Sequence, residues 1–250
     1  MAAAPSSAFF GATGLVGGHL LTALLALDGF GLVHTITRRV PVQAASSDAK
    51  KLDAIVEPET AKWVDRLQAL GNKDEASKST FPSLVFSALG TTRAQAGGLA
   101  NQWKIDHDLN VDIARAAKAA GATTFIFVSS AGTRAPLIRN SPYASMKNGV
   151  EDTIKELGFA QTIIIHPGII MGSREKGREH TGGDALAGIV RGFGRWISTG
   201  VQDSLGQEAD VIARATAHAA LLASQGKAPS PHWVLEAKDI VRLGRDEWKF

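Results

Sequence analysis

Tyr143 and Lys147 stand four residues apart in the segment SPYASMK, and this spacing could support acid–base chemistry. Ser141 is typical of a helix N-cap and Pro142 of the first helical position, so the segment predicts a helix that carries both side chains on one face. A neighbouring ammonium and a helix N-terminus both favour the phenolate of a tyrosine. Tyr143 could therefore exchange a proton with a carbonyl–alcohol couple. The alternative is a surface tyrosine beside a solvated lysine.

A serine hydroxyl upstream could complete this chemistry. The segment FVSSAG closes a predicted strand over 123–129, and its Ser130 could donate a hydrogen bond that holds a substrate oxygen near Tyr143. Ser129 competes for this role, because either hydroxyl could face the site.

A glycine-rich turn near the start of the chain predicts a phosphate site. The stretch FFGATGLVGGHLL places a G-x-x-G-x-x-G pattern between a predicted strand and a predicted helix, where free backbone N–H groups can face an anion. A plain strand-to-helix turn explains the glycines alone equally well. The residues expected to line a cofactor here are Gly11, Thr13, Gly14, Leu15, Val16 and Gly17.

The end of the second predicted strand indicates which dinucleotide would bind. An NAD site usually carries Asp or Glu about 20 residues past the turn, to bond the ribose 2′-hydroxyl. That place is Thr37, followed by Arg38 and Arg39, and no carboxylate occurs between Asp28 and Asp48. A guanidinium pair can bind a 2′-phosphate, so we predict NADP(H); two solvated arginines are the alternative.

Two further strand ends are expected to contact the cofactor. SALGTT (87–92) has small residues that let the chain pass close to a nucleotide, although a simple strand-end turn explains them almost as well. HPGII (166–170) closes the sixth predicted strand, and its Pro167 and Gly168 would turn the chain over the nicotinamide. The expected contacts are Ser87, Ala88, Leu89, Gly90, Pro167, Gly168, Ile169 and Ile170.

The elements that would position these residues alternate along the chain. Strands are predicted at 8–11, 32–37, 52–56, 83–88, 123–129, 161–166 and 232–236, and helices at 15–27, 60–70, about 98–120, 142–157, 183–197 and 208–224. The middle strands are nearly continuous apolar runs, as expected when both faces of a sheet are covered. This order predicts an α/β fold with a doubly wound parallel sheet. We expect one NAD(P)-binding domain over 1–250, in which residues about 168–210 form a small C-terminal substrate lobe.

The helix near 98–120 is expected to place Trp103, Leu109 and Ile113 on one buried side, and the segments 40–51 and 71–80 are expected to be surface loops.

Composition excludes several classes of function. The absence of cysteine excludes disulfides, thiol catalysis and thiolate zinc sites, and the seven histidines show no metal-binding spacing, so we expect no metal. A net charge of +3 without a basic stripe gives no support to nucleic-acid binding. The glycines and His19 argue against a spanning helix over 8–27, so we expect a soluble, cytoplasmic protein in the absence of a membrane partner.

The motifs GATGLVG, VSSAG, YASMK and HPG, in this order, resemble the short-chain dehydrogenase/reductase superfamily in its extended or atypical branch. Within that branch the chain is similar to fungal mitochondrial-proteome proteins related to the human Tat-interacting metastasis-suppressor oxidoreductase. This second resemblance is carried by FGATGLVGGHLL, TITRR, FSALGTTRAQAGG, QWKIDHDLNVDIARAAKAAG, QEADVIARA and DIVRLGR.

The resemblance implies a Rossmann fold, NADP(H) binding and peripheral association with the mitochondrial outer membrane. It places the family's tyrosine and lysine on Tyr143 and Lys147, its serine on Ser130 and its helix-four asparagine on Asn110, which would support Lys147 through a water. Relatives of this kind often dimerise through the helices near 98–120 and 142–157. Relatives of known activity have a bulkier substrate lobe, so their substrates do not transfer.

The expected function is therefore an NADP(H)-dependent oxidoreductase that moves a hydride to or from a small carbonyl or alcohol substrate. A protein that senses NADP(H) with little turnover is the alternative. A nucleotide-sugar epimerase or dehydratase is the third class; the missing acid after the second strand and the small lobe count against it.

Overall fold

A seven-stranded parallel sheet forms the centre of the computed structural model, which describes residues 4–45, 50–71, 81–172 and 206–249. The strand order is β3-β2-β1-β4-β5-β6-β9, and every pairing is parallel. The strands are β1 (Ser7–Phe10), β2 (Val33–Thr37), β3 (Leu52–Val56), β4 (Leu84–Ser87), β5 (Thr124–Val128), β6 (Gln161–Ile165) and β9 (His232–Leu235). All seven coincide with predicted strands, and the doubly wound α/β fold is confirmed.

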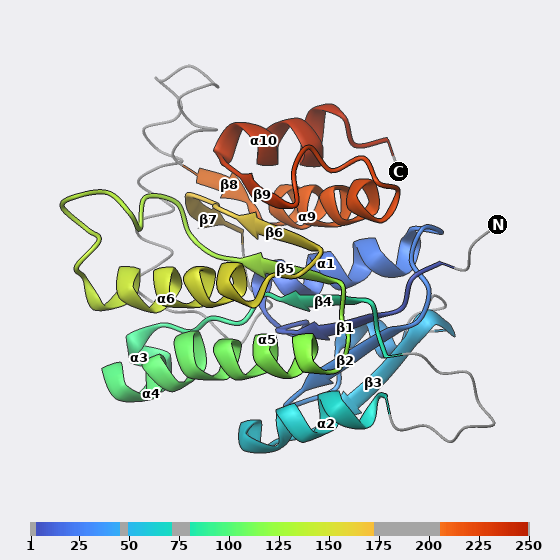
Figure 1. Ribbon diagram of the computed structural model, residues 1–250, viewed down its shortest axis with the longest axis horizontal. Helices are drawn as coiled ribbons and strands as arrows, with labels where there is room; N and C mark the ends of the chain where they lie inside the picture. Colours follow the sequence, from blue (N-terminus) through green and yellow to red (C-terminus); the bar gives the residue numbers. More distant parts are fainter. Residues whose placement is uncertain (1–3, 46–49, 72–80, 173–205, 250) are drawn as a thin grey trace.

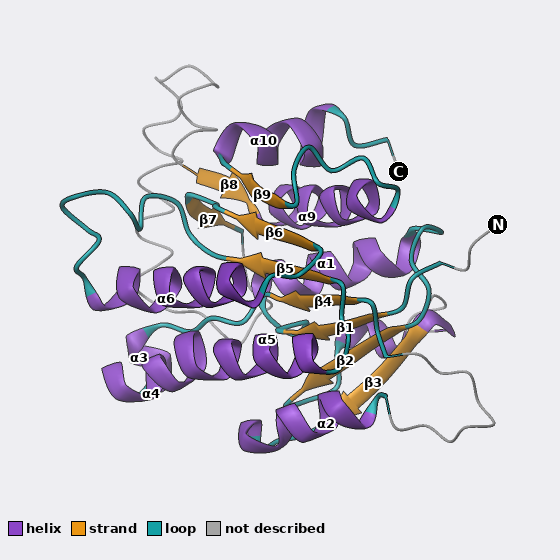
Figure 2. Ribbon diagram, in the orientation of Figure 1, coloured by secondary structure: helices purple, strands orange, loops and turns teal. Residues whose placement is uncertain are grey.

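Helices cover both faces of the sheet, which gives three layers (Figures 1 and 2). On one face lie α1 (Leu15–Ala26) and α9 (Ala209–Ser224), with α10 (Ala237–Val241) beside α9; on the other lie α2 (Trp63–Ala69), α5 (Leu109–Ala119) and α6 (Pro142–Leu157). A hydrophobic core lies on each face of the sheet, and adjacent residues of β1 point into different cores. Phe9 packs with α1 and α9, and Phe10 packs with α2 and α5. This double burial explains why the strands read as continuous apolar runs.

The long helix predicted near 98–120 is interrupted. The structure has α3 (Arg93–Ala96), α4 (Leu99–Trp103), a π-helical turn at Lys104–Asp108, and then α5. The expectation for Trp103 is therefore wrong: Leu109 and Ile113 enter the core, whereas Trp103 is only half-buried and its ring lies 5.0 Å from that of His107. The wider π-helical turn changes the phase of the helix between these residues.

Only the two ends of the predicted substrate lobe lie in the described residues. They form β7 (Ile169–Met171) and β8 (Gly206–Glu208), which pair in parallel as a separate two-stranded sheet. The helix predicted at 183–197 and most of the loop at 71–80 lie outside the described residues. In the other predicted loop, a short 3-10 helix occupies Val42–Ala45. The terminal α10 had no counterpart among the predicted elements.

The sheet reverses its order of winding between β1 and β4, because the chain runs outward through β2 and β3 before it returns to β4. In such sheets the carboxyl ends of the strands on the two sides of this point leave a crevice that binds ligands. The turns after β1, β2, β4, β5 and β6 all lie at this edge, so the topology brings the predicted site residues to one region.

Candidate functional site

The turn after β1 has the geometry of a phosphate cradle. Gly11 has a φ of 88°, and a Cβ there would lie 2.6 Å from the Ala88 carbonyl group, so only glycine fits between the turn and the end of β4. A Cβ at Gly17 would lie 2.0 Å from the Gly11 carbonyl oxygen, so this glycine lets α1 pack against the turn. Gly14 is the N-cap of α1 and caps it without a side chain. The cradle therefore offers backbone groups at a helix N-terminus.

The residues that follow β2 approach this cradle. Nη2 of Arg39 donates a hydrogen bond to the Thr13 carbonyl oxygen at 3.4 Å, and both Arg38 and Arg39 are exposed. The Thr37 hydroxyl donates to the Arg39 carbonyl oxygen at 2.8 Å and so fixes the bend. The structure thus places one guanidinium of the predicted pair on the glycine turn.

Glu57, just after β3, is a buried acid, and its carboxylate is paired with Arg66. Nη2 of Arg66 lies 2.9 Å from Oε2 of Glu57, and this hydrogen bond is the main reason why the pKa of Glu57 is lowered. The Glu57 carboxylate is therefore engaged by Arg66.

The loop after β4 lies beside the lysine of the predicted pair. A Cβ at Gly90 would lie 3.8 Å from Nζ of Lys147, which places the lysine head against this loop. Leu89 is buried in the core, and its N–H donates to Ser87 Oγ at 3.4 Å. Ala88 contacts the glycine turn, as described above. The loop thus connects the cradle to α6.

Tyr143 lies at the start of α6, which begins as predicted with Ser141 as its cap; the Ser141 hydroxyl accepts from the Ala144 N–H at 3.2 Å. Although 42% of the Tyr143 surface is exposed, burial raises the pKa of its phenol. A hydrogen bond with the Ser130 side chain lowers this pKa, and the negative charge of Asp106 raises it. The net direction is upward, so the phenol is protonated at neutral pH.

The Tyr143–Ser130 hydrogen bond also distinguishes the two candidate serines. Ser130 contacts Tyr143, whereas Ser129 is buried and its hydroxyl donates to the Glu151 carboxylate. The two side chains point in different directions because successive residues at a strand end alternate.

Lys147 is almost completely buried, with only 4% of its surface exposed. Its Nζ lies 5.0 Å from the centroid of the Phe127 ring. Burial lowers the pKa of Lys147, and the negative charges of Asp106 and Glu151 oppose this shift. Tyr143 and Lys147 share a face of α6, as their spacing predicts. The two nearby carboxylates favour the protonated form of Lys147.

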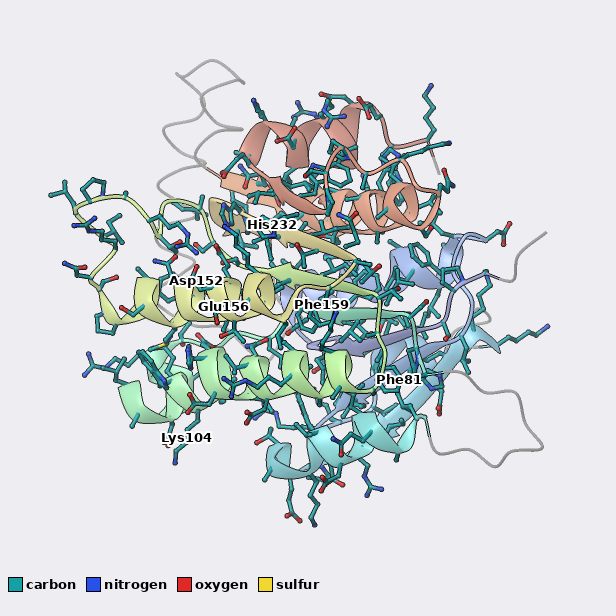
Figure 3. The ribbon with its side chains drawn as sticks, in the orientation of Figure 1. Phe81, Lys104, Asp152, Glu156, Phe159 and His232 are labelled. Carbon is teal, nitrogen blue, oxygen red and sulfur yellow. The ribbon has the colours of Figure 1, made fainter. Side chains whose placement is uncertain are left out.

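Glu151 belongs to a network that the motif analysis missed. Glu151 lies four residues after Lys147, just as Lys147 lies four residues after Tyr143. Extending the same i, i+4 spacing by one turn of α6 would therefore have pointed to Glu151. His166 Nε2 lies 3.0 Å from Glu151 Oε1, and its Nδ1 lies 3.0 Å from Glu236 Oε1. Arg134 pairs with both Glu151 and Asp152, the latter labelled on α6 in Figure 3.

Burial raises the pKa of Glu151, but hydrogen bonds from His166 and Ser129 outweigh it and the net pKa is lowered. Burial lowers the pKa of His166, but the hydrogen bonds and negative charges of Glu151 and Glu236 raise it by more. The net pKa of His166 is therefore raised.

The HPGII segment turns the chain at the two residues predicted, Pro167 and Gly168. The Pro167 carbonyl oxygen accepts from the Ala131 N–H at 2.8 Å, and the Gly168 N–H donates to Gln207 Oε1 at 2.8 Å. Ile169 and Ile170 follow this turn and belong to β7, where they pair with β8. The contact of these four residues with a cofactor stays a prediction.

Asn110 makes hydrogen bonds through both polar atoms of its side chain, and its predicted support of Lys147 through a water stays a prediction. It is fully buried; its Oδ1 accepts from the Ser87 hydroxyl at 2.6 Å, and its Nδ2 donates to the carbonyl oxygens of Ile105 and Asp106 at 3.1 and 3.2 Å. Since a π-helical turn leaves carbonyl groups that need donors, Asn110 stabilises this turn and ties it to the end of β4. Its hydrogen bonds therefore position the turn that carries Asp106.

Asp106 is a further buried acid that the motifs did not predict, with only 1% of its surface exposed. Burial raises its pKa, and the charge of Lys147 opposes the shift. In the sequence it is one of two acids in WKIDHD, and no spacing rule distinguishes it from Asp108.

In the described ranges, no group of three or more acidic or histidine side chains is arranged to hold a metal ion. Within the same ranges, no helix combines the length and apolar character needed to cross a membrane.

Solved structures with the same fold include sugar-nucleotide epimerases. MoeE5 in complex with UDP-glucose and NAD superposes with a TM-score of 0.60 at 16% identity, over 97% of this chain and 81% of that one. The UDP-Glc/GlcNAc 4-epimerase of Campylobacter jejuni superposes with a TM-score of 0.65 at 14% identity, over 95% and 82%. At these identities the likeness shows the Rossmann-type fold and no more.

Sequence relatives are much more similar. Protein fmp-52, mitochondrial, of Neurospora crassa is 52% identical over 98% of this chain and 97% of its own length. Protein FMP52, mitochondrial, of Chaetomium globosum is 52% identical over 98% of this chain and 99% of its own. The model of the NAD dependent epimerase/dehydratase family matches residues 9–192. With the cradle, the strand order and these matches together, the chain belongs to the NAD dependent epimerase/dehydratase family of extended short-chain dehydrogenases/reductases.

Proposed function

We propose that the protein is an NADP(H)-dependent oxidoreductase of the short-chain dehydrogenase type, which transfers a hydride to or from a small carbonyl or alcohol substrate. The observation that carries the proposal is that Tyr143 and the buried Lys147 lie one turn apart on α6, at the ligand-binding edge of the sheet, where Ser130 lowers the pKa of the Tyr143 phenol. A protein that only bound a nucleotide would have no need of this constellation.

The residues at the cradle fit a dinucleotide. The glycines at 11 and 17 let the turn pack tightly against the end of β4 and the start of α1, so that a pyrophosphate could approach the helix N-terminus, and the β4 loop passes beside Lys147. Arg39 on the turn and Arg38 next to it favour a 2′-phosphate, because guanidinium groups bind phosphate oxygens bidentately. Lys147 would hold the ribose, and Pro167 and Gly168 would border the nicotinamide. NADPH, when bound, would supply the hydride.

The phenol of Tyr143 is suited to donate a proton. Its raised pKa keeps it protonated at neutral pH, so it can protonate the oxygen of a carbonyl substrate as that oxygen gains charge. Ser130 would donate a hydrogen bond to the same oxygen and fix its position. The Lys147 ammonium would stabilise the phenolate left behind. In the direction of oxidation, the same phenolate would accept the proton of the alcohol.

A protein that senses NADP(H) is a second candidate, and one observation favours it. In the free chain burial shifts the pKa of Tyr143 upward and that of Lys147 downward, which works against an activated phenolate. Turnover with a carbonyl substrate would exclude this alternative. The epimerase or dehydratase alternative would use tightly held NAD, and the arginines after β2 argue against it.

The cellular setting follows from relatives alone. The similar fungal proteins are named mitochondrial, so we propose a peripheral position on the mitochondrial outer membrane. The relation to the human Tat-interacting oxidoreductase is part of the same proposal. We also propose a homodimer through α5 and α6, because relatives often dimerise through the corresponding helices. These two helices pack side by side on one face of the sheet (Figure 1).

The decisive test is cofactor binding followed by a substrate screen. Purified protein is expected to enhance NADPH fluorescence and to gain thermal stability with NADPH at concentrations where NADH has little effect. Aldehydes, ketones and quinones are then offered with NADPH, and oxidation is followed at the nicotinamide absorbance. Equal binding of the two cofactors would contradict the NADP(H) proposal; tight NADPH binding without turnover across the panel would favour the sensor.

A further inference from the structure

Asp106 is a buried carboxylate that the acid–base proposal leaves without a role. Its Oδ1 accepts from the Thr91 N–H at 2.7 Å, and its Oδ2 accepts from Gln102 Nε2 at 3.2 Å. The same Nε2 also donates to the Thr91 carbonyl oxygen at 3.1 Å. The Asp106 carboxylate therefore connects the π-helical turn to the loop after β4 by a hydrogen bond.

Gly90 lies between Asp106 and Lys147. A Cβ at Gly90 would be 3.9 Å from Oδ1 of Asp106 and 3.8 Å from Nζ of Lys147, so opposite charges flank the same loop residue. Both groups are almost fully buried, and each favours the charged form of the other. In a poorly solvated site such an attraction is much stronger than at the surface.

The other charged or titratable groups around Lys147 have partners of their own. Glu151, from α6, is engaged with His166 at the end of β6, and His107, from the π-helical turn, packs against Gly149 of α6. Tyr143, also from α6, is neutral while it is protonated. The carboxylate in the π-helical turn is thus the one best placed to compensate the ammonium.

We propose that Asp106 is a positioning residue of the cofactor site, which holds the Gly90–Thr91 loop against α6 and supplies the buried negative charge that keeps the Lys147 ammonium protonated. The role toward a cofactor ribose rests on the proposed function. The charge pairing itself is a property of the free chain and is tested without cofactor.

The direct test titrates Lys147 by NMR. Protein labelled with ¹³C at the lysine Cε atoms is titrated in the absence of cofactor, and the Lys147 signal is assigned with Lys147→Arg. Asp106→Asn preserves the size of the side chain and is expected to lower the midpoint of the Lys147 titration by about one pH unit or more. Asp112→Asn makes the same charge change at an exposed site on α5 and is expected to leave the midpoint in place. An unchanged midpoint in folded Asp106→Asn protein would overturn the proposal.

Cofactor binding provides the second readout. Asp106→Asn is expected to weaken NADPH binding, with a loss that grows to about tenfold above the lowered midpoint as the ammonium deprotonates. Asp106→Glu keeps the charge but displaces Thr91, so it is expected to weaken binding by the same factor at every pH. A pH-independent loss in Asp106→Asn would mean a purely structural role and would overturn the charge claim.

Folding is checked by circular dichroism, with Asp106→Ser as a second neutral variant. If neither neutral variant folds, Asp106 belongs to the fold alone and the proposal is wrong. If wild-type protein fails to bind NADPH while Asp106→Asn still lowers the Lys147 midpoint, the proposed function fails and the pairing stands.

Discussion

Arg39 and Thr13 connect two turns of the candidate cofactor site: Nη2 of the arginine donates to the threonine carbonyl oxygen at 3.4 Å, across the glycine turn after β1. Arg39 follows by two residues the position, Thr37, where an NAD site usually carries its acidic residue. The contact is long and exposed, so it leaves the guanidinium free to exchange this partner for a phosphate.

The first prediction concerns this arginine pair. Replacement of Arg38 and Arg39 by alanine is expected to weaken NADPH binding by about 10- to 100-fold, because hydrogen bonds to charged groups contribute about 1.5–3 kcal/mol. NADH binding is expected to change by less than about threefold. Fluorescence titration of both cofactors measures the ratio, and Arg115→Ala on the exposed side of α5 is the matched control. Equal losses for both cofactors would refute a 2′-phosphate contact.

The second prediction concerns Tyr143. Tyr143→Phe removes only the hydroxyl, so turnover is expected to fall by about 10²- to 10⁴-fold, the usual contribution of a general acid. NADPH affinity and the thermal unfolding midpoint are expected to stay close to wild type, since 42% of the residue is exposed. Steady-state kinetics with a substrate from the carbonyl screen gives the answer. Undiminished turnover would remove Tyr143 from the mechanism.

The third prediction separates the two adjacent serines. Ser130→Ala is expected to reduce turnover with little change in stability, because its hydroxyl contacts Tyr143. Ser129→Ala is expected to lower the free energy of unfolding by about 1–3 kcal/mol, because the buried Glu151 loses a hydrogen-bond donor. Urea unfolding and kinetics are measured on both variants. The reverse pattern would show that the two serines have been assigned the wrong way round.

The fourth prediction compares neighbouring glycines of α1. Gly17→Ala would bring a Cβ to 2.0 Å from the Gly11 carbonyl oxygen, so α1 must move; we expect a loss of about 1–3 kcal/mol of stability together with loss of NADPH binding. At Gly18 the nearest atom to a Cβ is the end of the Gln43 side chain, at 3.8 Å. Gly18→Ala is therefore expected to be neutral or to stabilise by up to about 1 kcal/mol through helix propensity. Similar effects at both positions would contradict the close packing of α1 on the turn.

The fifth prediction is a pH dependence that comes from His166 and Glu151. The folded pKa of His166 is raised from 6.5, so its stabilisation is complete below pH 6.5 and is lost as pH rises through the raised value. The folded pKa of Glu151 is lowered from 4.5, so its stabilisation is complete above pH 4.5 and is lost as pH falls through the lowered value. The pair therefore stabilises the fold most between pH 4.5 and 6.5.

Urea unfolding between pH 4 and 9 tests this window. The difference in stability between wild type and His166→Gln is expected to be largest below pH 6.5 and to shrink as pH rises. His232 offers a control of opposite sign: burial lowers its pKa from 6.5, so His232→Gln is expected to gain relative stability as pH falls. A pH-independent difference for His166→Gln would show that the network carries no proton-linked stability.

Much of the fold follows from local sequence patterns. The apolar runs of the inner strands predict a doubly wound sheet because these strands are buried on both faces, as Phe9 and Phe10 demonstrate within β1. Ser141 and Pro142 predict the start of α6, and a glycine in the left-handed region, Gly158, ends it. Such signals depend only on a residue and its near neighbours in the chain.

Part of the candidate site could be predicted in the same way. Tyr143 and Lys147 share a helix face by spacing alone, and the cradle glycines are recognisable because the turn needs a positive φ at Gly11 and close approach at Gly17. The arginines after β2 were found by counting from the glycine turn. The cofactor preference inferred from them is a prediction that the sequence alone supports.

The sequence by itself determined the strand and helix pattern, the cradle and the tyrosine–lysine pair, whereas the tertiary structure decided which polar groups meet around them. It directs Ser129 to Glu151 and Ser130 to Tyr143, and it engages Asn110 with Ser87 and a π-helical turn. It also brings Asp106 to the loop beside Lys147. The physical reason is that burial and contacts between separate crossovers set the partners of a charged group, and these depend on how the elements pack.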